Sequence, residues 1–296
     1  MSDSDEIIDL IKQSDSKFSK SQRRIAAYIT EHYDSAAFMT ASKLGKVVNV
    51  SESTVVRFAS ELGYDGYPEF QQALRELIKN KLTSVQRMEI TSSKIGEGDV
   101  LKKVLQNDID KLRQTMETVS TDDFETALDS VVNAGCVYIL GARTCFSIAS
   151  FLGVYLNMLL PNVKLITANS AGEVFEQMYR INSGDVLIAI SYPRYSRRTF
   201  NGVKFASERG AKVIAITDSL VSPIVSYATT SLIAGCDMSN FVDSLVAPLS
   251  LVNSLIVAIT IRNKDTAAQT FESLEGIWEK YKVYSETDSV HGGQNE

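Results

Sequence analysis

Hydrophobic side chains in the first 80 residues recur every three or four positions, which is the spacing of one face of a helix. The pattern predicts five helices: Glu6–Gln13, a second that Ser19 or Ser21 caps, two short ones within Thr40–Leu62, and a last over Glu69–Leu82. We therefore expect these residues to fold as an all-α domain.

The pattern changes after residue 135, where short, continuously apolar runs alternate with segments of helical periodicity. The runs are Cys136–Gly141, Val163–Thr167, Asp185–Ser191, Lys212–Thr217 and Ser231–Ala234. Such alternation is typical of βα units, because helices cover both faces of a parallel sheet and its strands become apolar throughout. Helices are expected over Ser147–Leu159, Ala171–Ile181, Arg198–Arg209, Pro223–Ala228, Val242–Arg262 and Ala267–Lys282. The pattern predicts an α/β domain with a parallel five-stranded sheet.

Thr40–Leu62 has the pattern of two short helices joined by a tight turn. Ser51 is a natural N-cap for the second helix, since its hydroxyl can accept from backbone N–H groups two or three residues further on. Asn49 suits the end of the first helix and Gly63 the end of the second, because both tolerate the left-handed backbone conformation. The buried stripes are expected at Leu44, Val47, Val48, Val55, Phe58, Ala59 and Leu62. The pattern is typical of a helix-turn-helix, although other pairs of amphipathic helices resemble it.

The outward positions of this motif carry groups that bind DNA. In a helix-turn-helix the first residues of the second helix meet base edges in the major groove. Hydroxyl groups can donate or accept hydrogen bonds there, and Arg pairs with guanine or with phosphate. We expect DNA contacts from Lys43, Ser51, Ser53, Thr54 and Arg57.

Polar residues separate the two halves of the chain. Residues 83–98 contain the sequences Ser92-Ser-Lys and Gly96-Glu-Gly, a composition that favours a linker, and two further helices are expected over Asp99–Val119 and Asp122–Asn133. The resulting division is a helix-turn-helix domain at 1–80, a linker at 81–98, a ligand-binding α/β domain at 99–284 and a flexible tail at 285–296.

Composition bears on where the protein is located and on whether an acidic chain can bind DNA. The 296 residues suit two domains, and neither a signal peptide nor an apolar run of membrane-spanning length is found. An odd count of three cysteines in apolar segments favours a reducing cytoplasm over a disulfide or metal framework. The net charge is −6, yet Lys17–Arg57 holds seven Lys and Arg against three acidic residues. A modest positive surface of this kind suits a DNA reader with few phosphate contacts, or an ordinary solvated face.

Two loops that follow predicted strands carry groups suited to an anion. Ligands of parallel α/β sheets bind at the carboxyl ends of the strands, where helix N-termini and Arg side chains attract anions. The loops are Gly141–Ser147 and Ser191–Thr199. We expect effector contacts from Gly141, Arg143, Thr144, Cys145, Ser191, Arg194, Tyr195, Ser196 and Thr199. The alternative is an exposed basic loop that pairs with acidic neighbours, and one or both of Arg197 and Arg198 are candidates to face solvent.

Groups for catalysis are sparse. The two histidines, His32 and His291, lie outside the predicted sheet, and Glu173, Glu176 and Asp218 are best interpreted as helix-surface or helix-capping residues. Neither a metal-ligand spacing, nor a phosphate-binding GxxxxGK[ST] loop, nor a nucleophile elbow is found. We therefore expect neither enzymatic activity nor a cofactor or metal.

Four segments closely resemble the RpiR family of bacterial transcriptional regulators: Phe18–Ile29, Thr40–Leu44, Val50–Phe58 and Leu62–Phe70. The later part, through Gly141, Ser191 and Thr217-Asp-Ser219, resembles the family's sugar isomerase (SIS) domain. The resemblance implies a helical DNA-binding domain, a flavodoxin-like SIS domain that senses phosphosugars, and assembly into dimers or higher oligomers.

The two ligand loops depart from the family's usual sequences. The first, usually Gly-x-Gly-x-Ser, falls on Gly141–Cys145, where Arg143 replaces the second glycine and Cys145 the serine. The second, usually Ser-x-Ser-Gly-x-[Ser/Thr], falls around Ser191–Thr199 with Pro193-Arg194 in place of Ser-Gly. The resemblance thus implies anion binding in which arginines replace small residues.

Together these observations favour a DNA-binding transcriptional regulator that a small anionic, phosphosugar-like effector controls through the SIS domain. The expected partners are double-stranded DNA with an inverted repeat, a phosphorylated sugar or other small anionic metabolite, and further copies in a homodimer or tetramer. No membrane partner is expected. Two alternatives remain open: a sugar-phosphate isomerase with an accessory helical domain, and a regulator whose SIS domain serves only for dimerisation.

Overall fold

The computed structural model describes residues 6–78, 83–96, 98–168, 170–236 and 242–284. It divides into two compact units. The first holds Met1–Lys111 with the short segments Tyr192–Tyr195 and Cys236–Ser244, and the second holds the remaining residues. Each unit is described by itself.

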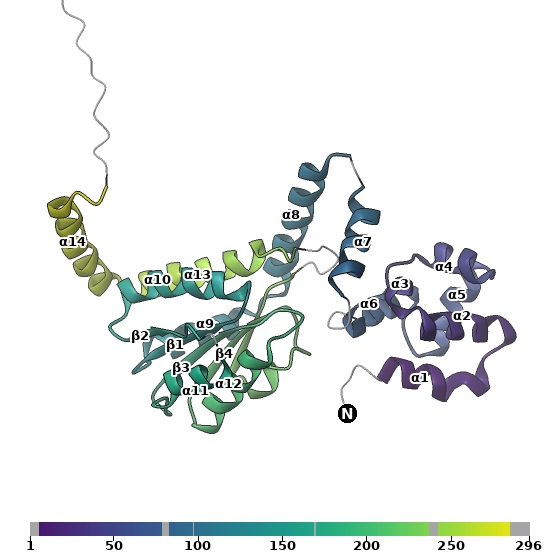
Figure 1. Cartoon of the computed structure of the whole chain (residues 1–296), viewed down its shortest axis with the longest axis horizontal. Helices are drawn as coiled ribbons and strands as arrows, with labels where there is room; N and C mark the ends of the chain where they lie inside the picture. Colours follow the sequence, from purple (N-terminus) through teal and green to yellow (C-terminus); the bar gives the residue numbers. More distant parts are fainter. Residues whose placement is uncertain (1–5, 79–82, 97, 169, 237–241, 285–296) are drawn as a thin grey trace, which may run out of the picture. The chain divides into compact units, whose positions relative to one another are not determined.

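The first unit begins with a helical domain (Figure 1). Its helices are α1 (Glu6–Ser14), α2 (Lys20–Glu31), α3 (Tyr33–Ala36), α4 (Ala41–Val48), α5 (Glu52–Glu61) and α6 (Tyr67–Ile78), with a 3₁₀ turn, η2 (Asp15–Lys17), after α1. Phe58 of α5 lies at the centre of the core, with its ring 5.0 Å from that of Phe18 and 5.8 Å from that of Phe70. Five helices were predicted and are confirmed in the described residues, whereas the short α3 was not predicted.

The ends of α4 and α5 follow from their capping residues. Thr40 and Ser51 cap the two helices through hydrogen bonds from the backbone N–H groups of residues 43 and 54. Asn49 ends α4 in the left-handed conformation, with φ of 52°. Gly63 has φ of 92°, and the N–H of Tyr64 donates to the carbonyl of Ala59 at 3.1 Å, which is the hydrogen bond of a Schellman motif. The sequence therefore determines where both helices begin and end.

The segment predicted as a linker contains a helix that the pattern did not predict. This helix is α7 (Ser84–Ile95), which Thr83 and Gln86 begin with a capping box, and α8 (Val100–Thr118) follows it. Arg87 of α7 is buried and forms an ion pair with Asp243. The domain boundaries given above stay a prediction.

The second unit is built on a five-stranded parallel sheet, as predicted. The strands are β1 (Val137–Gly141), β2 (Val163–Leu165), β3 (Val186–Ile190), β4 (Lys212–Thr217) and β5 (Thr230–Ile233), in the order β2-β1-β3-β4-β5. The helices are α9 (Thr121–Val132), α10 (Cys145–Leu159), α11 (Ala171–Met178), α12 (Arg197–Glu208), α13 (Val246–Arg262) and α14 (Lys264–Tyr281). Every residue of β1 and β3 is buried, as the continuous apolar runs predict.

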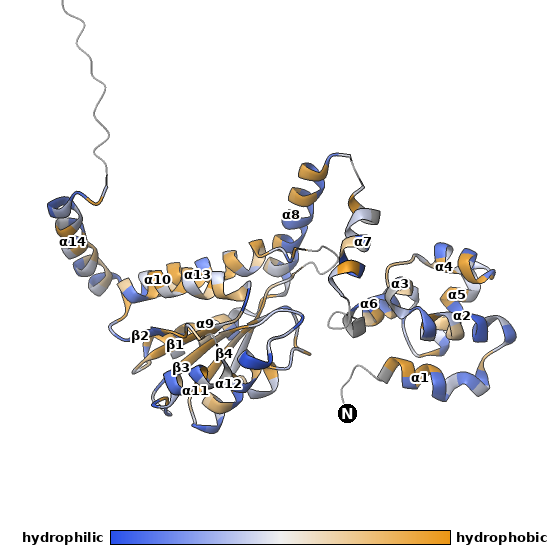
Figure 2. Ribbon diagram, viewed as in Figure 1, coloured by the Kyte–Doolittle hydropathy of each residue, from blue (hydrophilic) through white to orange (hydrophobic). Residues whose placement is uncertain are grey.

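Helices cover both faces of the sheet (Figure 1). Helices α10 and α13 lie side by side on one face with α9 next to α13, and α11 and α12 lie on the other. Figure 2 shows mostly hydrophobic residues along the strands and along α10 and α13. The carboxyl ends of β1, β3 and β4 therefore lie at one edge, between two helical layers.

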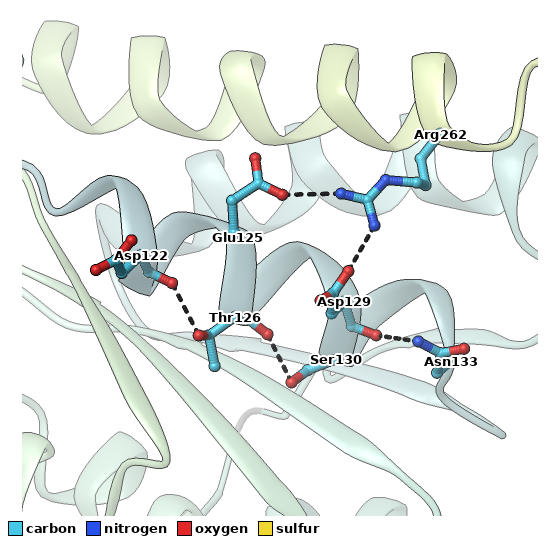
Figure 3. Close-up of polar contacts among 7 residues, drawn as sticks. All are labelled: Asp122, Glu125, Thr126, Asp129, Ser130, Asn133 and Arg262. Atoms are coloured by element: carbon cyan, nitrogen blue, oxygen red, sulfur yellow. Dashed lines mark hydrogen bonds and ion pairs between the residues drawn. The ribbon is translucent and has the colours of Figure 1, made fainter.

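An ion-pair network ties α13 to α9 (Figure 3). Arg262, at the end of α13, donates to Glu125 at 2.8 Å and to Asp129 at 2.5 Å. The two carboxylates lie one turn apart on α9, so that one guanidinium spans both. The hydrogen bond to Asp129 is the main cause that raises the pKa of Arg262.

Several predicted boundaries differ from the structure. The helix predicted over Pro223–Ala228 is only a 3₁₀ turn, η3 (Val225–Tyr227), because the backbone is already extended at Ala228 and the N–H of Thr229 donates to the carbonyl of Val213 in β4. Helix α13 begins at Val246, with Pro248 in its first turn, where a missing N–H costs nothing. The predicted tail at 285–296 lies outside the described residues.

Across the described residues no single helix is long and apolar enough to cross a membrane. The pair α13 and α14 meets that test of length and composition only when the two are taken together across a 99° bend.

Candidate functional sites

The first candidate site is the amino end of α5 together with the start of α4. Ser51, Ser53 and Arg57 are exposed and Thr54 is half-buried. The Ser51 hydroxyl lies 2.9 Å from that of Ser53 and 2.7 Å from that of Thr54, so the first turn presents three hydroxyl groups in one cluster. Because each hydroxyl can donate and accept, the cluster can exchange these contacts for contacts to base edges or phosphates.

The core of the domain holds this surface in place. Val55, Phe58 and Ala59 are fully buried on the inner side of α5. Arg24 of α2 donates to the carbonyl of Asn49 at 3.2 Å and thereby supports the turn between α4 and α5. Lys43, in the first turn of α4, is exposed. The predicted DNA-contacting residues thus share one helix pair, and four of the five are exposed.

The second candidate site lies at the carboxyl ends of β1 and β3, which are neighbours in the sheet. In the strand order β2-β1-β3, the chain leaves β1 toward β2 on one side and later returns to β3 on the other side. Ligands of parallel α/β sheets bind at the carboxyl ends of the two strands where the order reverses in this way. A Cβ atom on Gly141 would lie 2.6 Å from the carbonyl oxygen of Cys145, so only glycine lets β1 turn into α10 this closely. Cys145 is itself buried as the first residue of α10.

Two arginines have unusual backbone conformations in the loops that follow β1 and β3. Arg143 has φ of 59° and Arg194 has φ of 63°. Residues other than glycine, Asn and Asp rarely adopt this region, at a cost of about 1 kcal/mol or more. Both occupy positions where the resembling family usually has glycine, so the loop conformation is kept while a charged side chain is added.

A pocket of about 300 Å³ opens beside Arg143. Its lining comes from the end of β1 and the start of α10, from the β2–α11 loop at Ile166–Ala168, and from Arg198 of α12. Arg198 donates to the carbonyl of Ala168 at 2.5 Å and joins two of these walls. The lining contains two arginines and no Asp, Glu or His, so the pocket suits an anion.

Buried hydroxyl groups gather at the same edge of the sheet. Ser196 caps α12 by accepting from the backbone N–H of Thr199. The side-chain oxygens of Ser191, Thr199, Ser219 and Ser222 are buried, and none of the described protein groups forms a hydrogen bond with them. An unpaired buried hydroxyl costs about 1–3 kcal/mol, and a bound ligand or water that supplies the partner removes that cost.

The structure separates the predicted effector residues into groups. Gly141 and Arg143 line the pocket, while Ser191, Ser196 and Thr199 stand at the β3–α12 connection of the second unit. Thr144 and Cys145 start α10 beside the pocket without lining it. Arg194 and Tyr195 belong to the first unit, where Arg194 donates to the Ser84 hydroxyl at 3.2 Å.

Sequence reasoning missed the β2–α11 loop and left Arg198 unassigned. Residues Ile166, Thr167 and Ala168 are uncharged, so no residue type marked them. The order of strands in the sheet places the loop after β2 beside the loop after β1, and the apolar pattern does not specify that order. In the described residues no group of three or more potential metal ligands occurs.

The fold and the two candidate sites define a class of protein, a helix-turn-helix regulator with an α/β domain. Residues 6–81 match the helix-turn-helix domain of the rpiR family, and residues 130–258 match the SIS domain. The chain therefore belongs to the RpiR family of transcriptional regulators and contains a SIS domain.

Individual relatives agree with this assignment. The chain is 22% identical to the HTH-type transcriptional regulator HexR of Pseudomonas aeruginosa over 262 residues, which cover 86% of this chain and 90% of that protein. The sugar isomerase domain of an RpiR transcription factor from Sphaerobacter thermophilus is 28% identical, with a TM-score of 0.57, over 60% of this chain and 98% of that one. The Vibrio vulnificus NanR protein, solved with ManNAc-6P, has the same fold at 21% identity and a TM-score of 0.57, over 91% of this chain and 98% of that one.

Proposed function

We propose that α5 of this regulator reads DNA in the major groove and that a small phosphosugar-like anion bound in the SIS domain controls this binding. The observation that supports the first part is the exposed hydroxyl cluster of Ser51, Ser53 and Thr54, followed one turn later by the exposed Arg57. The pocket between Arg143 and Arg198 supports the second part.

On DNA, the first turn of α5 meets base edges while Lys43 contacts a phosphate. A homodimer presents two such helices, and an inverted repeat matches the two-fold symmetry of the protein, with half-sites roughly 34 Å apart, about one turn of DNA. A regulator of the chromosome acts where the chromosome is, which is why we expect it in the cytoplasm.

Arg57→Ala tests the reading surface. If Arg57 contacts a base, the variant loses about 1–3 kcal/mol of specific binding and discriminates less at one position of the site. If Arg57 contacts only phosphate, binding to specific and to scrambled duplexes weakens equally. Fluorescence anisotropy with duplexes from the region upstream of the neighbouring genes measures both.

Lys12→Ala is the control, since Lys12 is an exposed basic residue on α1, away from the motif. Unchanged affinity of Arg57→Ala for a duplex that the native protein binds specifically would exclude Arg57 from the reading surface.

The effector is a small molecule with a phosphate or a similar anionic group. Its anionic group meets Arg143 and Arg198, and its hydroxyls meet Ser191 and Thr199, whose buried oxygens have no hydrogen-bond partner among the described residues. Binding controls DNA affinity only if the effector favours one arrangement of the two reading heads, typically by ~1–3 kcal/mol of coupling.

A thermal-shift screen of phosphorylated sugars tests effector binding. A ligand at 100 times its dissociation constant stabilises the native state by about 2.7 kcal/mol, which raises the unfolding temperature measurably. Arg143→Ala and Thr199→Val should abolish the shift. Lys212→Ala should keep it, because Lys212 lies at the opposite end of β4. If no phosphorylated metabolite stabilises the native protein, the SIS domain serves assembly alone.

We propose that the SIS domain binds without catalysis. Aldose–ketose isomerisation needs an acid and a base within hydrogen-bond reach of the substrate, and the pocket lining offers no carboxylate or imidazole. Turnover of aldose or ketose phosphates by the purified protein would overturn this part and leave the DNA-reading part standing.

A further inference from the structure

Two large hydrophobic side chains are exposed on the helical domain, and both belong to the helix-turn-helix. Among the described residues 6–78 they are Val47 of α4, at 48%, and Val56 of α5, at 38%. Val47 was expected in the buried stripe of α4, and the structure shows that this expectation is wrong. An apolar group on a helix surface loses free energy by its contact with water, so each valine needs a separate explanation.

The two valines lie on different sides of the helix pair. A Cβ atom on Gly45 would lie 3.5 Å from the backbone nitrogen of Glu52, so position 45 faces the start of α5. Val47 follows two residues later, about 200° further round α4, and therefore points away from α5. Val56 instead lies on the exposed side of α5, within one turn of the hydroxyl cluster.

An acidic residue shares this side of α5 with Val56. Glu52 is exposed and lies four residues before Val56, a spacing that makes the two side chains neighbours on the helix surface. It is the only acidic residue between Thr40 and Ser60. We name this side of the helix the Glu52–Val56 edge.

The Glu52–Val56 edge is unsuited to the DNA backbone. Phosphates repel a carboxylate, and a valine side chain has no group that donates a hydrogen bond to them. Contacts to phosphate come from Lys, Arg, hydroxyl groups and backbone N–H groups. A helix in the major groove that turned this edge toward a phosphate strand would bind less well, so the edge fits the base edges at the floor of the groove.

Two groups on the base edges match the two side chains. The amino group N4 of cytosine donates to a carboxylate, and the C5 methyl group of thymine packs against an apolar side chain. Adenine also has an amino group in the major groove, but the acceptor N7 beside it repels a carboxylate. Both matching groups therefore belong to pyrimidines.

We propose that the Glu52–Val56 edge reads pyrimidines, with Glu52 accepting from the amino group of a cytosine and Val56 packing on the methyl group of a thymine. The proposal rests on the proposed function, because it requires α5 to lie in the major groove. Valine in a helix has one strongly preferred χ1 rotamer, so its methyl groups are held in place before DNA binds. The two residues lie about 6 Å apart along α5, which is less than two base steps of about 3.4 Å. The two bases should therefore be one or two steps apart.

Replacing thymine by deoxyuridine tests the Val56 contact, because only the methyl group is lost. The full chain selects a duplex from a random pool, each thymine of that duplex is replaced in turn, and fluorescence anisotropy measures the affinity. Uracil at one position of each half-site should weaken native binding about fourfold, the value of one buried methyl group. Val56→Ser should weaken binding to the thymine duplex by a similar factor, and uracil should then weaken it no further.

The control for Val56→Ser is Val47→Ser, which makes the same change on the side of α4 that points away from α5. It should keep the uracil response of the native protein. Serine and valine have similar helix propensities and both valines are exposed, so circular dichroism should show that both variants fold.

Glu52→Ala tests the cytosine contact. The variant should lose at least about fivefold of the preference for cytosine at one position of each half-site. It should also bind scrambled duplexes more tightly, because a negative charge near the phosphates is removed. Glu61→Ala is the matched control, since Glu61 is exposed at the last residue of α5, and it should keep the cytosine preference.

Two results overturn the proposal and leave the DNA-reading function standing. One is equal affinity of the native protein for thymine and uracil at every position of a duplex that it binds specifically. The other is an unchanged base preference in Glu52→Ala at every position. A native protein that enriches no sequence from the pool would instead overturn the proposed function together with this reading of pyrimidines.

Discussion

Gly45→Ala should disturb the DNA-reading surface without replacing any of its side chains. Gly45 lies inside α4, and its carbonyl accepts from the N–H of Val50 in the turn that leads to α5. A Cβ atom at Gly45 would lie 2.8 Å from the carbonyl oxygen of Val50 and 3.5 Å from the backbone nitrogen of Glu52. Because the atoms it meets are backbone, relief requires α5 to move relative to α4.

The magnitude follows from two opposing terms. Replacing glycine by alanine in a helix interior gains about 1 kcal/mol of helix propensity. Overpacking against an unyielding neighbour costs about 1–3 kcal/mol. Gly276 of α14 supplies the matched control, because a Cβ atom there meets nothing within 4 Å and Gly276→Ala keeps only the gain. The two variants should therefore differ by about 1–3 kcal/mol in local stability.

Hydrogen exchange measures each helix separately and avoids assuming a single unfolding transition for a two-unit protein. Amides of α4 and α5 should exchange faster in Gly45→Ala, and those of α14 more slowly in Gly276→Ala. DNA affinity should fall in Gly45→Ala alone. If Gly45→Ala instead slows amide exchange in α4 and α5, as Gly276→Ala slows it in α14, the close approach of Gly45 to the backbone of Val50 is refuted.

Three further predictions concern stability. Ser51→Ala should cost about 1 kcal/mol by removing the N-cap of α5, measurable by hydrogen exchange, and Ser51→Gly should restore most of it. Arg87→Met should lower the local stability of α7 by about 3 kcal/mol in hydrogen exchange, because the half-buried Asp243 loses its partner, and Asp243→Asn added to it should recover part of the loss. Burial raises the pKa of Tyr67 from 10.0 to about 12, so the folded state resists ionisation and stability present below pH 10 should fall as the pH rises from 10 through 12. Tyr67→Phe should flatten this decline, and an identical decline in that variant would contradict it.

Local signals in the sequence were sufficient for five of the six helices described in the helical domain, all except α3. Hydroxyl caps at Thr40 and Ser51 and left-handed ends at Asn49 and Gly63 act within a few residues, so their effect can be read from the sequence. The continuous apolar runs likewise predicted five parallel strands. A strand that is buried on both faces is apolar at every position, and this makes it easy to recognise in the sequence.

Features that depend on distant partners were not visible in the sequence. Helix α7 was not predicted, and its anchor Arg87 pairs with Asp243, which is 156 residues further along the chain. The pocket lining likewise joins three separate connections, and Arg198 of α12 donates to the carbonyl of Ala168, which is 30 residues away in the chain. The pocket contacts follow from the order of strands in the sheet, which the apolar pattern does not specify.

Selection of duplexes from a random DNA pool by the full chain tests the central claim most directly. We expect the pool to converge on an inverted repeat, and Arg57→Ala to lose or relax one position in each half-site while Lys12→Ala reproduces the native motif. A phosphorylated sugar that stabilises the protein should change the amount of DNA retained, and Arg143→Ala should remove that response. A pool that shows no enriched sequence with the native protein would contradict the account.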